Sequence, residues 1–398
     1  MNANASITSR TTRLLELWRS HFTSSIGRAG LVGLTTGFFY VIWAARYLTR
    51  HSIYDLAAIG TQFLAQGKGS SATIDALAPH AVEGGYDGQF VLYIALDPTE
   101  AHHYADAPTY RLSRILYPIA ARVLALGQAG AIPWMLLLLN IAAVVFGTFA
   151  LALLLVRRNV SPWVALLFGA SPALWIAVDR DITEPLAYAL VIGALLALDS
   201  QRWLTSGLLF GLAGITRETT LLFPLALIIL AAWGLGVKRR RPDELMLFGA
   251  LAFGPYIWVR IVLYAWLGSD PPPGAPSFSW PPFSGLSGHA TQFQYEQLLA
   301  VVLPGFLALA AAALFLHGAR KWLILPLALN VLVLIVLLPE SSYATFQSSG
   351  RITLGVVVAF AALCIPDFPD RRRTAAVVAP ALLWFTPWYD FFPIAVLS

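Results

Sequence analysis

The feature that most constrains this chain is its series of long apolar segments, because several are long enough to cross a bilayer. The stretch 132–156 holds no charged residue, and about 20 apolar residues suffice to cross the hydrocarbon core. With 58% hydrophobic residues, 12% charged residues and a mean hydropathy of +0.69, the chain is far more apolar than a soluble domain. We therefore predict an all-α, polytopic integral membrane protein.

Hydropathy divides the chain into about 11 transmembrane helices. The expected spans are 29–49, 132–156, 161–178, 183–200, 203–216, 219–237, 245–267, 297–316, 322–338, 352–366 and 374–392. We expect residues 1–398 to form a single transmembrane domain. Within it, 1–28 form a cytoplasmic lead-in, 51–128 an outer loop with interfacial helices, and 268–296 a second outer loop. The apolar piece 112–128 is short and interrupted by Pro118, so we expect it to lie at the interface or to re-enter the membrane.

Basic residues gather on one side of this topology. The runs Lys238–Arg241, Arg320–Lys321 and Arg371–Arg373 all fall on the side of the N-terminus. Positively charged loops face the cytoplasm, so we expect an N-terminus inside and a location in the cytoplasmic membrane of a bacterium. These runs would contact lipid headgroups, and we expect no nucleic-acid partner. The single cysteine, Cys364, excludes a disulfide within the chain and a cysteine-based metal site.

The polar residues that are hardest to place in a membrane protein gather on the opposite side. They are Asp87, His102, His103, Asp106, Arg111 and Arg114 in the first outer loop, Asp181 and Glu184 in one turn, Arg217 and Glu218 in the next, and Glu340 and Arg351 around a third. Ionisable residues next to hydrocarbon are costly and mark functional sites by default. The pattern therefore predicts a site at the outer face.

Asp87 has two interpretations. Phe90, Val91 and Ile94 recur at helical spacing and predict a short helix on the bilayer surface, which Asp97-Pro98 would end. At the start of this helix, Asp87 would be either a simple N-cap or a functional carboxylate beside the membrane.

The turns that contain Asp181 and Glu184, and Arg217 and Glu218, likewise have a structural and a functional interpretation. Asp181 or Thr183 would cap a helix that has Glu184 in its first turn, and Arg217 and Glu218 would form an ion pair at a helix end. In the functional interpretation, Asp181 and Glu184 share a helix face because they are three residues apart. The span 203–216 is also too short to reach the surface unless its end borders a water-filled cavity.

A metal site is left open by the first outer loop. Asp87, His102, His103 and Asp106 are metal-ligand types, and a divalent ion such as Mg or Mn is the candidate. Adjacent loop histidines do not naturally converge on one ion, however, so solvated loop residues are the simpler interpretation. No glycine-rich phosphate loop follows a strand pattern, so nothing in the sequence indicates a nucleotide donor.

Four short motifs in residues 80–225 give the chain a family resemblance. They are Tyr86-Asp-Gly-Gln-Phe90, Arg114-Ile-Leu-Tyr-Pro118, Thr183-Glu-Pro185 and Gly214-Ile-Thr-Arg-Glu218, and Gly350-Arg351 is a further match. In this order they resemble the membrane-embedded GT-C glycosyltransferases. The nearest likeness is to the mannosyltransferase branch related to the enzyme that adds the second mannose to GPI anchors. Tyr86 departs from the pattern, because eukaryotic relatives usually have Trp there.

The resemblance implies a GT-C fold and an inverting transfer of a sugar, a mannose-like hexose or a pentose, from a polyprenyl-phosphate donor to a cell-surface glycan or glycolipid. It also implies that the first outer loop supplies the general base, at the position of Asp87. Such a transfer needs a carboxylate that takes the acceptor proton and cations that meet the leaving phosphate. The expected binding residues are Arg217, Glu218, Asp181, Glu184, Arg114, Arg351, Tyr86 and Gln89, with Arg111 in reserve.

Two other functions stay open. A secondary transporter or flippase for lipid-linked sugars would carry ionisable residues near the middle of its spans and paired broken helices. An O-antigen-type ligase or polymerase would share arginines at the outer face but use a pyrophosphate-linked donor. The sequence shows neither transporter feature, and the acidic first loop around Asp87 favours the polyprenyl-phosphate transferase over the ligase or polymerase.

Overall fold

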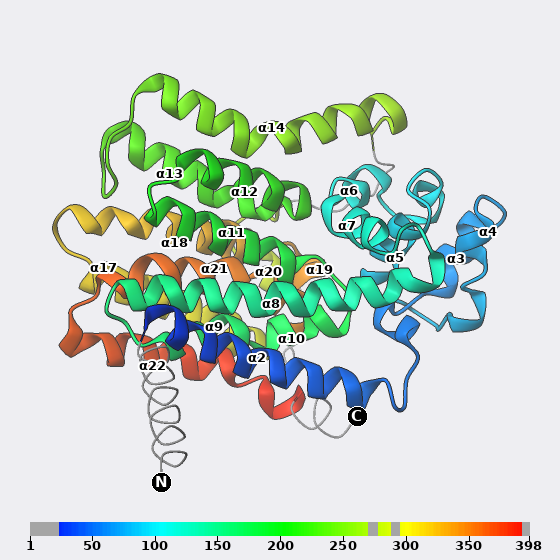
Figure 1. Ribbon diagram of the computed structural model, residues 1–398, viewed down its shortest axis with the longest axis horizontal. Helices are drawn as coiled ribbons and strands as arrows, with labels where there is room; N and C mark the ends of the chain where they lie inside the picture. Colours follow the sequence, from blue (N-terminus) through cyan, green and yellow to red (C-terminus); the bar gives the residue numbers. More distant parts are fainter. Residues whose placement is uncertain (1–23, 270–277, 288–294, 392–398) are drawn as a thin grey trace, which may run out of the picture.

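The computed structural model describes residues 24–269, 278–287 and 295–391, and these residues are predominantly helical. The long helices run side by side along the longest axis of the molecule, and the segment between α2 and α8 packs against one end of them (Figure 1). The β-structure in the described residues is an isolated bridge between Gly60 and Val82. The predicted all-α fold class is therefore confirmed.

The α-helices follow one another with short connections. In chain order they are α2 (Ser25–Tyr47), α3 (Thr61–Gly67), α4 (Ala72–Asp75), α5 (Gly88–Leu96), α6 (Pro108–Leu112), α7 (Leu116–Leu124), α8 (Ile132–Arg157), α9 (Leu166–Gly169), α10 (Pro172–Asp179), α11 (Glu184–Asp199), α12 (Trp203–Thr216), α13 (Leu222–Trp233), α14 (Pro242–Leu267), α15 (Ser284–Ser287), α17 (Leu303–Phe315), α18 (Ile324–Val331), α19 (Glu340–Tyr343), α20 (Phe346–Ile352), α21 (Leu354–Ala359) and α22 (Asp370–Phe385).

Shorter turns extend or link these helices. Turns of 3₁₀-helix cover Ile53–Ala57, Ala78–His80, Ala101–Tyr104, Ala129–Ala131, Pro162–Ala165, Glu218–Leu221, Gly318–Leu323 and Ile365–Asp367. Single π-helical turns cover Leu298–Val302, Leu332–Val336 and Phe360–Cys364. The π-turns lie within long apolar helices, where such local widening is tolerated because neighbouring helices satisfy the backbone.

Six helices among the described residues are long and apolar enough to cross a membrane. They are Ser25–Tyr47, Ala129–Arg157, Pro242–Leu267, Tyr295–Phe315, Gly318–Val336 and Phe346–Asp367. A seventh span results if Pro162–Gly169 and Pro172–Asp179, which meet at a bend of 46°, are one broken crossing. The chain is thus a multi-pass membrane protein, and these segments coincide with seven of the predicted spans.

The other four predicted spans are helices of lesser length. Segments 203–216 and 219–237 correspond to α12 and to Glu218–Trp233, which are apolar but short. Segment 183–200 corresponds to α11, which has 16 residues. Segment 374–392 corresponds to α22, also of 16 residues, which begins at Asp370 and takes in the Arg371–Arg373 run.

The helices differ in how much of their surface other helices cover. Helix α14 lies at the edge of the bundle (Figure 1) and exposes Ile257, Trp258 and Ile261. Helix α21 is buried along its whole length. A helix that exposes large apolar side chains on its outer face suits a lipid environment.

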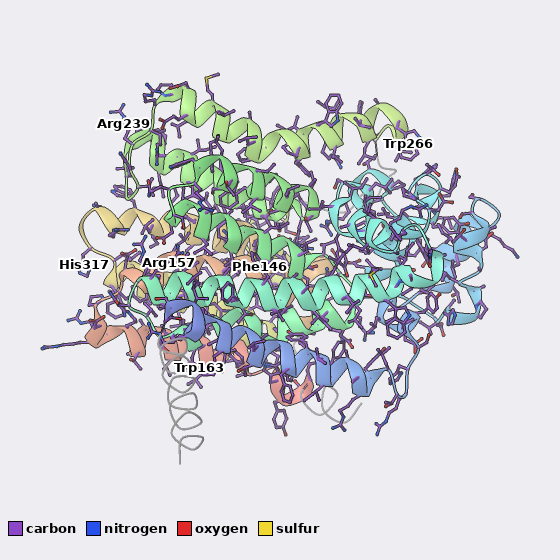
Figure 2. The ribbon with its side chains drawn as sticks, in the orientation of Figure 1. Phe146, Arg157, Trp163, Arg239, Trp266 and His317 are labelled. Carbon is purple, nitrogen blue, oxygen red and sulfur yellow. The ribbon has the colours of Figure 1, made fainter. Side chains whose placement is uncertain are left out.

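The first outer loop packs against one end of the bundle. The Tyr117 hydroxyl donates to the Leu136 carbonyl at 2.8 Å, which fixes α7 beside the first turns of α8. Arg260 of α14 donates to the Thr109 carbonyl at 3.0 Å. The other end carries Arg157, Arg239 and His317 (Figure 2). The basic runs and the first outer loop thus lie at opposite ends of the helices.

The structure describes only part of two predicted segments, the lead-in 1–28 and the second outer loop 268–296. Of the lead-in 1–28, residues 1–23 lie outside the described residues, and Ser24 caps α2 by accepting from the Gly27 amide at 3.0 Å. Of the second outer loop 268–296, residues 270–277 and 288–294 lie outside. The part between them is held at the bundle by backbone hydrogen bonds to Val336 and Leu337.

The prediction of a helix on the bilayer surface after Asp87 is right about the helix and wrong about its surroundings. Helix α5 covers Gly88–Leu96, but all nine residues are buried inside the protein, because the rest of the first outer loop folds around it. Helix α7 has one buried and one exposed side, since Tyr117 and Ala121 are buried while Val123 and Leu124 are 64% and 56% exposed.

Candidate active site

A close backbone contact brings Asp87 to the turn between α10 and α11. Gly84 and Gly85 have φ angles of +94° and +81°, which glycine adopts without strain, and they turn the chain into α5. A Cβ at Gly88 would lie 2.0 Å from the Arg180 carbonyl oxygen. Only glycine therefore fits at this position, and its small size sets Asp87 beside the residues that start α11.

The Asp87 carboxylate lies between two arginines from different parts of the chain. Its Oδ1 is 3.0 Å from Arg111 Nη1, and its Oδ2 accepts from Arg351 Nη2. Burial raises the pKa of Asp87, but Arg351 and Arg111 outweigh it, so the pKa of this carboxyl lies well below its ordinary value. Asp87 occupies the N-cap position of α5 yet makes no side-chain capping bond. Its interpretation as a simple helix cap is therefore wrong.

Arg351 joins the first outer loop to the membrane helices. Its Nη1 donates to Glu184 Oε1 at 2.8 Å, while its Nη2 donates to Asp87. Its guanidinium also lies over the Tyr86 ring, 5.2 Å from the centroid, and the Tyr86 hydroxyl is 3.4 Å from Ser348 Oγ. One side chain on α20 thus bridges the carboxylates that begin α5 and α11.

Glu184 is fully buried and shared by two arginines. Besides Arg351, it has Arg217 Nη1 2.9 Å from its Oε1. Two N–H groups here are buried without a hydrogen-bond acceptor among the described residues, namely Arg217 Nε and Arg351 Nε. Buried donors without a partner are costly, so this corner of the cluster is suited to an additional acceptor.

Arg217 and Glu218 do not pair with each other, so the interpretation as a simple helix-end ion pair is wrong. The extended backbone at Arg217, with φ −159°, sends the neighbouring side chains to different partners. Glu218 is 2.7 Å from Arg114 Nη2, and the Arg114 guanidinium lies 4.3 Å from the centre of the Tyr110 ring. Arg114 and Glu218 thus tie the first outer loop to the turn before α13.

Asp181 and Gln89 fall outside this cluster. Asp181 has a left-handed backbone, φ +46°, so α11 begins only at Glu184 and the predicted shared helix face does not form. Its Oδ1 is buried without a partner among the described residues, and burial, with the charge of Asp179, raises its pKa well above the ordinary value. Gln89 accepts from the Gly60 amide at 2.9 Å and holds the first outer loop together.

The four residues of the first outer loop that could bind a metal, Asp87, His102, His103 and Asp106, do not converge on one point. Asp106 is bound by Arg111 at 2.8 Å, which separates it from Asp87. His103 lies 3.5 Å from Glu100, and His102 packs against the Trp266 ring. Among the described residues, no group of three or more His, Cys, Asp or Glu side chains could hold a metal ion.

Arg111 is the site residue whose role the sequence least indicates. It holds both Asp87 and Asp106, and its guanidinium lies 4.2 Å from the centre of the Phe90 ring. The available signal was its spacing of three residues from Arg114 in a loop next to a membrane. This spacing places both on one face of a helical turn, although α6 ends between them at Leu112.

The cluster encloses almost no free space. A cavity of about 20 Å³ lies among its side chains, which is room for about one water molecule. Its lining residues are Asp87, Phe90, Val91, Ile94, Arg111, Arg114, Ile182, Thr183, Glu184 and Arg351. A larger ligand therefore enters only if ion pairs of the cluster separate.

Comparison with known proteins assigns no family or function to this site. No family model, no curated protein and no solved structure matches the chain.

Proposed function

We propose that this chain is a membrane glycosyltransferase of the GT-C type, which moves a hexose or pentose from a polyprenyl-phosphate donor to a glycan or glycolipid acceptor with inversion. The observation that carries the proposal is the double contact of Arg351 with Asp87 and Glu184. It joins a carboxylate able to accept a proton to a buried cation able to hold a phosphate. These are the two groups that the transfer needs.

The donor phosphate would bind where guanidinium groups have unused donors. Arg351 and Arg217 both reach Glu184 from neighbouring helix ends, and both have buried N–H groups without an acceptor among the described residues. Guanidinium binds phosphate oxygens in a bidentate way and stays charged when buried. Arg114, held by Glu218, lines the small cavity together with Arg351 and would meet a further oxygen.

The resting ion pairs explain how the base would be switched on. Two arginines hold the pKa of Asp87 below its ordinary value despite burial, and a carboxylate in that state is a weak base. A donor phosphate that takes Arg351 would leave Asp87 with fewer cations and raise its basicity. Donor binding would thus both open the closed cluster and activate the base.

The transfer itself balances with these groups. Asp87 takes the proton of the acceptor hydroxyl as the acceptor oxygen bonds to the anomeric carbon. The bond from that carbon to the donor phosphate breaks on the opposite face, and the electron pair leaves with polyprenyl phosphate. Arg351 and Arg217 stabilise the charge that develops on the phosphate. The leaving group is already an anion of low basicity, so the step needs no general acid.

The placement of the cluster supports a lipid-linked donor. It lies at the end of the helices opposite the basic residues Arg157 and Arg239 (Figure 2), which corresponds to the outer side by the distribution of positive charge. Helix α7 exposes Val123 and Leu124 beside it, as an interfacial helix does. We propose that α11, α12, α13 and α22 complete an 11-helix arrangement in a bacterial cytoplasmic membrane.

One observation favours the alternative of a transporter or flippase. The bend of 46° between α9 and α10 is the kind of helix break that transporters use at a substrate site. The experiment must therefore detect chemistry under conditions in which transport is impossible, and detergent micelles meet that need because they have no second compartment.

The test is transfer by the purified full-length chain in micelles. It is given polyprenyl-phosphate mannose, glucose or arabinose, with a bacterial membrane lipid extract as the acceptor source. We expect release of polyprenyl phosphate together with acceptor lipids heavier by one sugar. Asp87→Asn should lower the rate of formation of both products by about 10²–10⁴, whereas Glu100→Gln, a charge removal in the same outer loop, should not.

The other outcomes reject the proposal in different ways. Saturable binding of the donor without any product, by a chain that moves the same lipid across vesicles, would indicate a flippase. Product that forms only when a pyrophosphate-linked sugar replaces these donors would indicate a ligase or polymerase. Full activity of Asp87→Asn would remove Asp87 from the mechanism.

A further inference from the structure

A second charged region lies at the end of the bundle opposite the candidate active site. Glu184 begins α11 and Asp199 ends it, so the two regions are separated by the length of that helix, roughly 22 Å at 1.5 Å per residue. A cavity of about 440 Å³ opens next to Asp199. This volume falls within the range of small-molecule sites.

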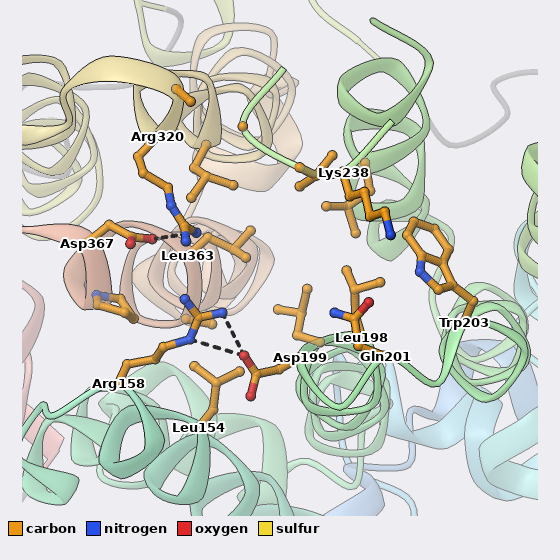
Figure 3. Close-up of a pocket in the computed structure, with 18 of the residues that line it drawn as sticks. Leu154, Arg158, Leu198, Asp199, Gln201, Trp203, Lys238, Arg320, Leu363 and Asp367 are labelled. Atoms are coloured by element: carbon orange, nitrogen blue, oxygen red, sulfur yellow. Dashed lines mark hydrogen bonds and ion pairs between the residues drawn. The ribbon is translucent and has the colours of Figure 1, made fainter. Parts of the chain in front are cut away.

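Four basic side chains from three segments line this cavity (Figure 3). Arg158 follows α8, Lys238 and Arg240 lie between α13 and α14, and Arg320 belongs to the turn before α18. In Figure 3, Arg158 and Arg320 point toward each other from opposite walls. A single anion between these two walls would be within reach of both.

The carboxylates in the cavity neutralise only part of this charge. Asp199 accepts from Arg158 at 2.6 Å, and Asp367 lies 3.6 Å from Arg320. Lys238 has no ion pair or hydrogen bond with any residue that the structure describes. Arg240 stacks on Trp203, 4.4 Å from the ring centre, and its Nε is buried without an acceptor in the described part of the chain. Four cations and two carboxylates thus line the cavity, and Glu244, which does not line it, lies 3.5 Å from Arg240.

The remaining wall of the cavity is apolar. Leu154, Leu198 and Leu363 project between the charged groups (Figure 3), and they come from three different helical segments. A cavity with a basic part and an apolar part suits a ligand that carries a negative charge on a hydrocarbon body. Basic pockets between membrane helices bind phosphate headgroups for this reason.

We propose that this cavity binds a phosphate ester, for which the nearest source in a membrane is the headgroup of an anionic phospholipid. Arg158 and Arg320 meet the phosphate from opposite walls, Lys238 and Arg240 flank it, and the leucines contact the adjoining hydrocarbon. The site does not depend on the proposed transferase activity. It concerns different residues at the other end of the bundle.

The test is calorimetric titration of the purified full-length chain in a nonionic detergent. Dihexanoyl phosphatidylglycerol is the anionic lipid probe, dihexanoyl phosphatidylcholine the zwitterionic lipid, and glycerol 3-phosphate the headgroup alone. We expect phosphatidylglycerol to bind saturably and phosphatidylcholine to bind much more weakly. Equal affinity for glycerol 3-phosphate would assign the site to a soluble phosphate ester, and no binding of either phosphate probe overturns the proposal.

Two matched pairs of variants locate the binding, because the outer cluster also contains arginines. Lys238 and Arg320 line the cavity, whereas their neighbours Arg239 and Lys321 carry the same charge and do not line it. Lys238→Gln and Arg320→Gln should each weaken binding about tenfold, the value of one charged hydrogen bond. Arg239→Gln and Lys321→Gln should stay within about twofold of the wild type. Equal losses in both members of each pair would show diffuse surface attraction and overturn the site.

Discussion

Glu184 and Glu244 stand in the first turns of two apolar helices at opposite ends of the molecule, and both contact two arginines. Glu184 pairs with Arg217 and Arg351, and its side chain is 0% exposed. Glu244 pairs with Arg240 and Arg241, at 3.5 and 3.8 Å, and its side chain is 41% exposed. The residue types and the helix position are alike, so the difference between the two sites is one of burial.

Burial changes what the same residues can do. An exposed ion pair is screened by water and contributes about 0–1 kcal/mol, so its arginines are free to exchange partners with an arriving anion. A buried pair is held by strong charge–charge attraction, and removal of one partner leaves an uncompensated charge. In the outer cluster, a ligand must therefore separate buried ion pairs before it can bind. The inner cavity has free space that a ligand can fill without this step.

The largest expected difference between the two ends is catalytic. Asp87→Asn should lower turnover by about 10²–10⁴, the usual contribution of a general base, with retained folding and donor binding. Asp243→Asn, which removes an exposed carboxylate paired with Arg241 at the inner end, should leave turnover unchanged. The measurement is initial rate at saturating donor, with thermal unfolding as the check on folding. Equal rates for both variants would show that Asp87 is not the general base.

The second expected difference is in stability. Glu184→Gln leaves Arg217 with no carboxylate partner among the described residues and should cost about 3–5 kcal/mol. Glu244→Gln should cost at most about 1 kcal/mol, because water solvates the arginines that it leaves. Unfolding by denaturant in bicelles measures both free energies. A loss below about 1 kcal/mol for Glu184→Gln would mean that the cluster is hydrated and that its closure is not a barrier to ligands.

The sequence predicted most of the residues that meet at the outer end but not how they pair. Charge placement at loop ends brought Asp87, Glu184, Arg217 and Arg351 together, because hydrocarbon forces polar groups to one surface. The partners depend on backbone angles that hydropathy does not report. Asp181 was misplaced in this way, since its left-handed backbone delays the start of α11.

The sequence does not indicate the inner cavity, for a different reason. The run Lys238–Arg241 has an adequate explanation as a topology determinant, and such an explanation gives no reason to look for a site. Its partners Arg158 and Arg320 lie far from it in sequence. Only the packing of α8, α11 and the turn before α18 brings these cations around one space, and tertiary packing of this kind leaves no periodic signal.

The third expected difference concerns the shape of the cation. Arg217→Lys keeps the charge but loses the planar fork that binds two phosphate oxygens, and it should weaken donor affinity about tenfold. Arg241→Lys, at an exposed pair, should change affinity by less than about twofold. Equilibrium binding of a fluorescent polyprenyl-phosphate sugar measures both constants. Unchanged affinity in Arg217→Lys would make Arg217 a structural partner of Glu184 alone.

The smallest expected effect is the pH dependence that Asp87 gives to stability. Its ordinary pKa is 3.8, and in the folded protein the arginines hold it lower despite burial. Below pH 3.8 the unfolded chain takes up a proton that the folded chain does not, so stability falls as the pH falls. Above that value both states are charged and the contribution is constant. The difference in unfolding free energy between wild type and Asp87→Asn should thus stay constant from pH 8 to about pH 4 and then decrease by on the order of 1 kcal/mol.

Asp243→Asn serves as the control for general acid denaturation in this measurement. A difference that already changes between pH 8 and pH 6 would mean that burial outweighs Arg351 and Arg111, and that the pKa of Asp87 is raised. Asp87 would then be basic before any donor arrives, and the ion pairs would no longer act as its switch. That result would leave Asp87 as the proposed base but would exclude its activation by the donor phosphate. The arginines would then not lower the pKa of Asp87, so their removal by the phosphate could not raise it.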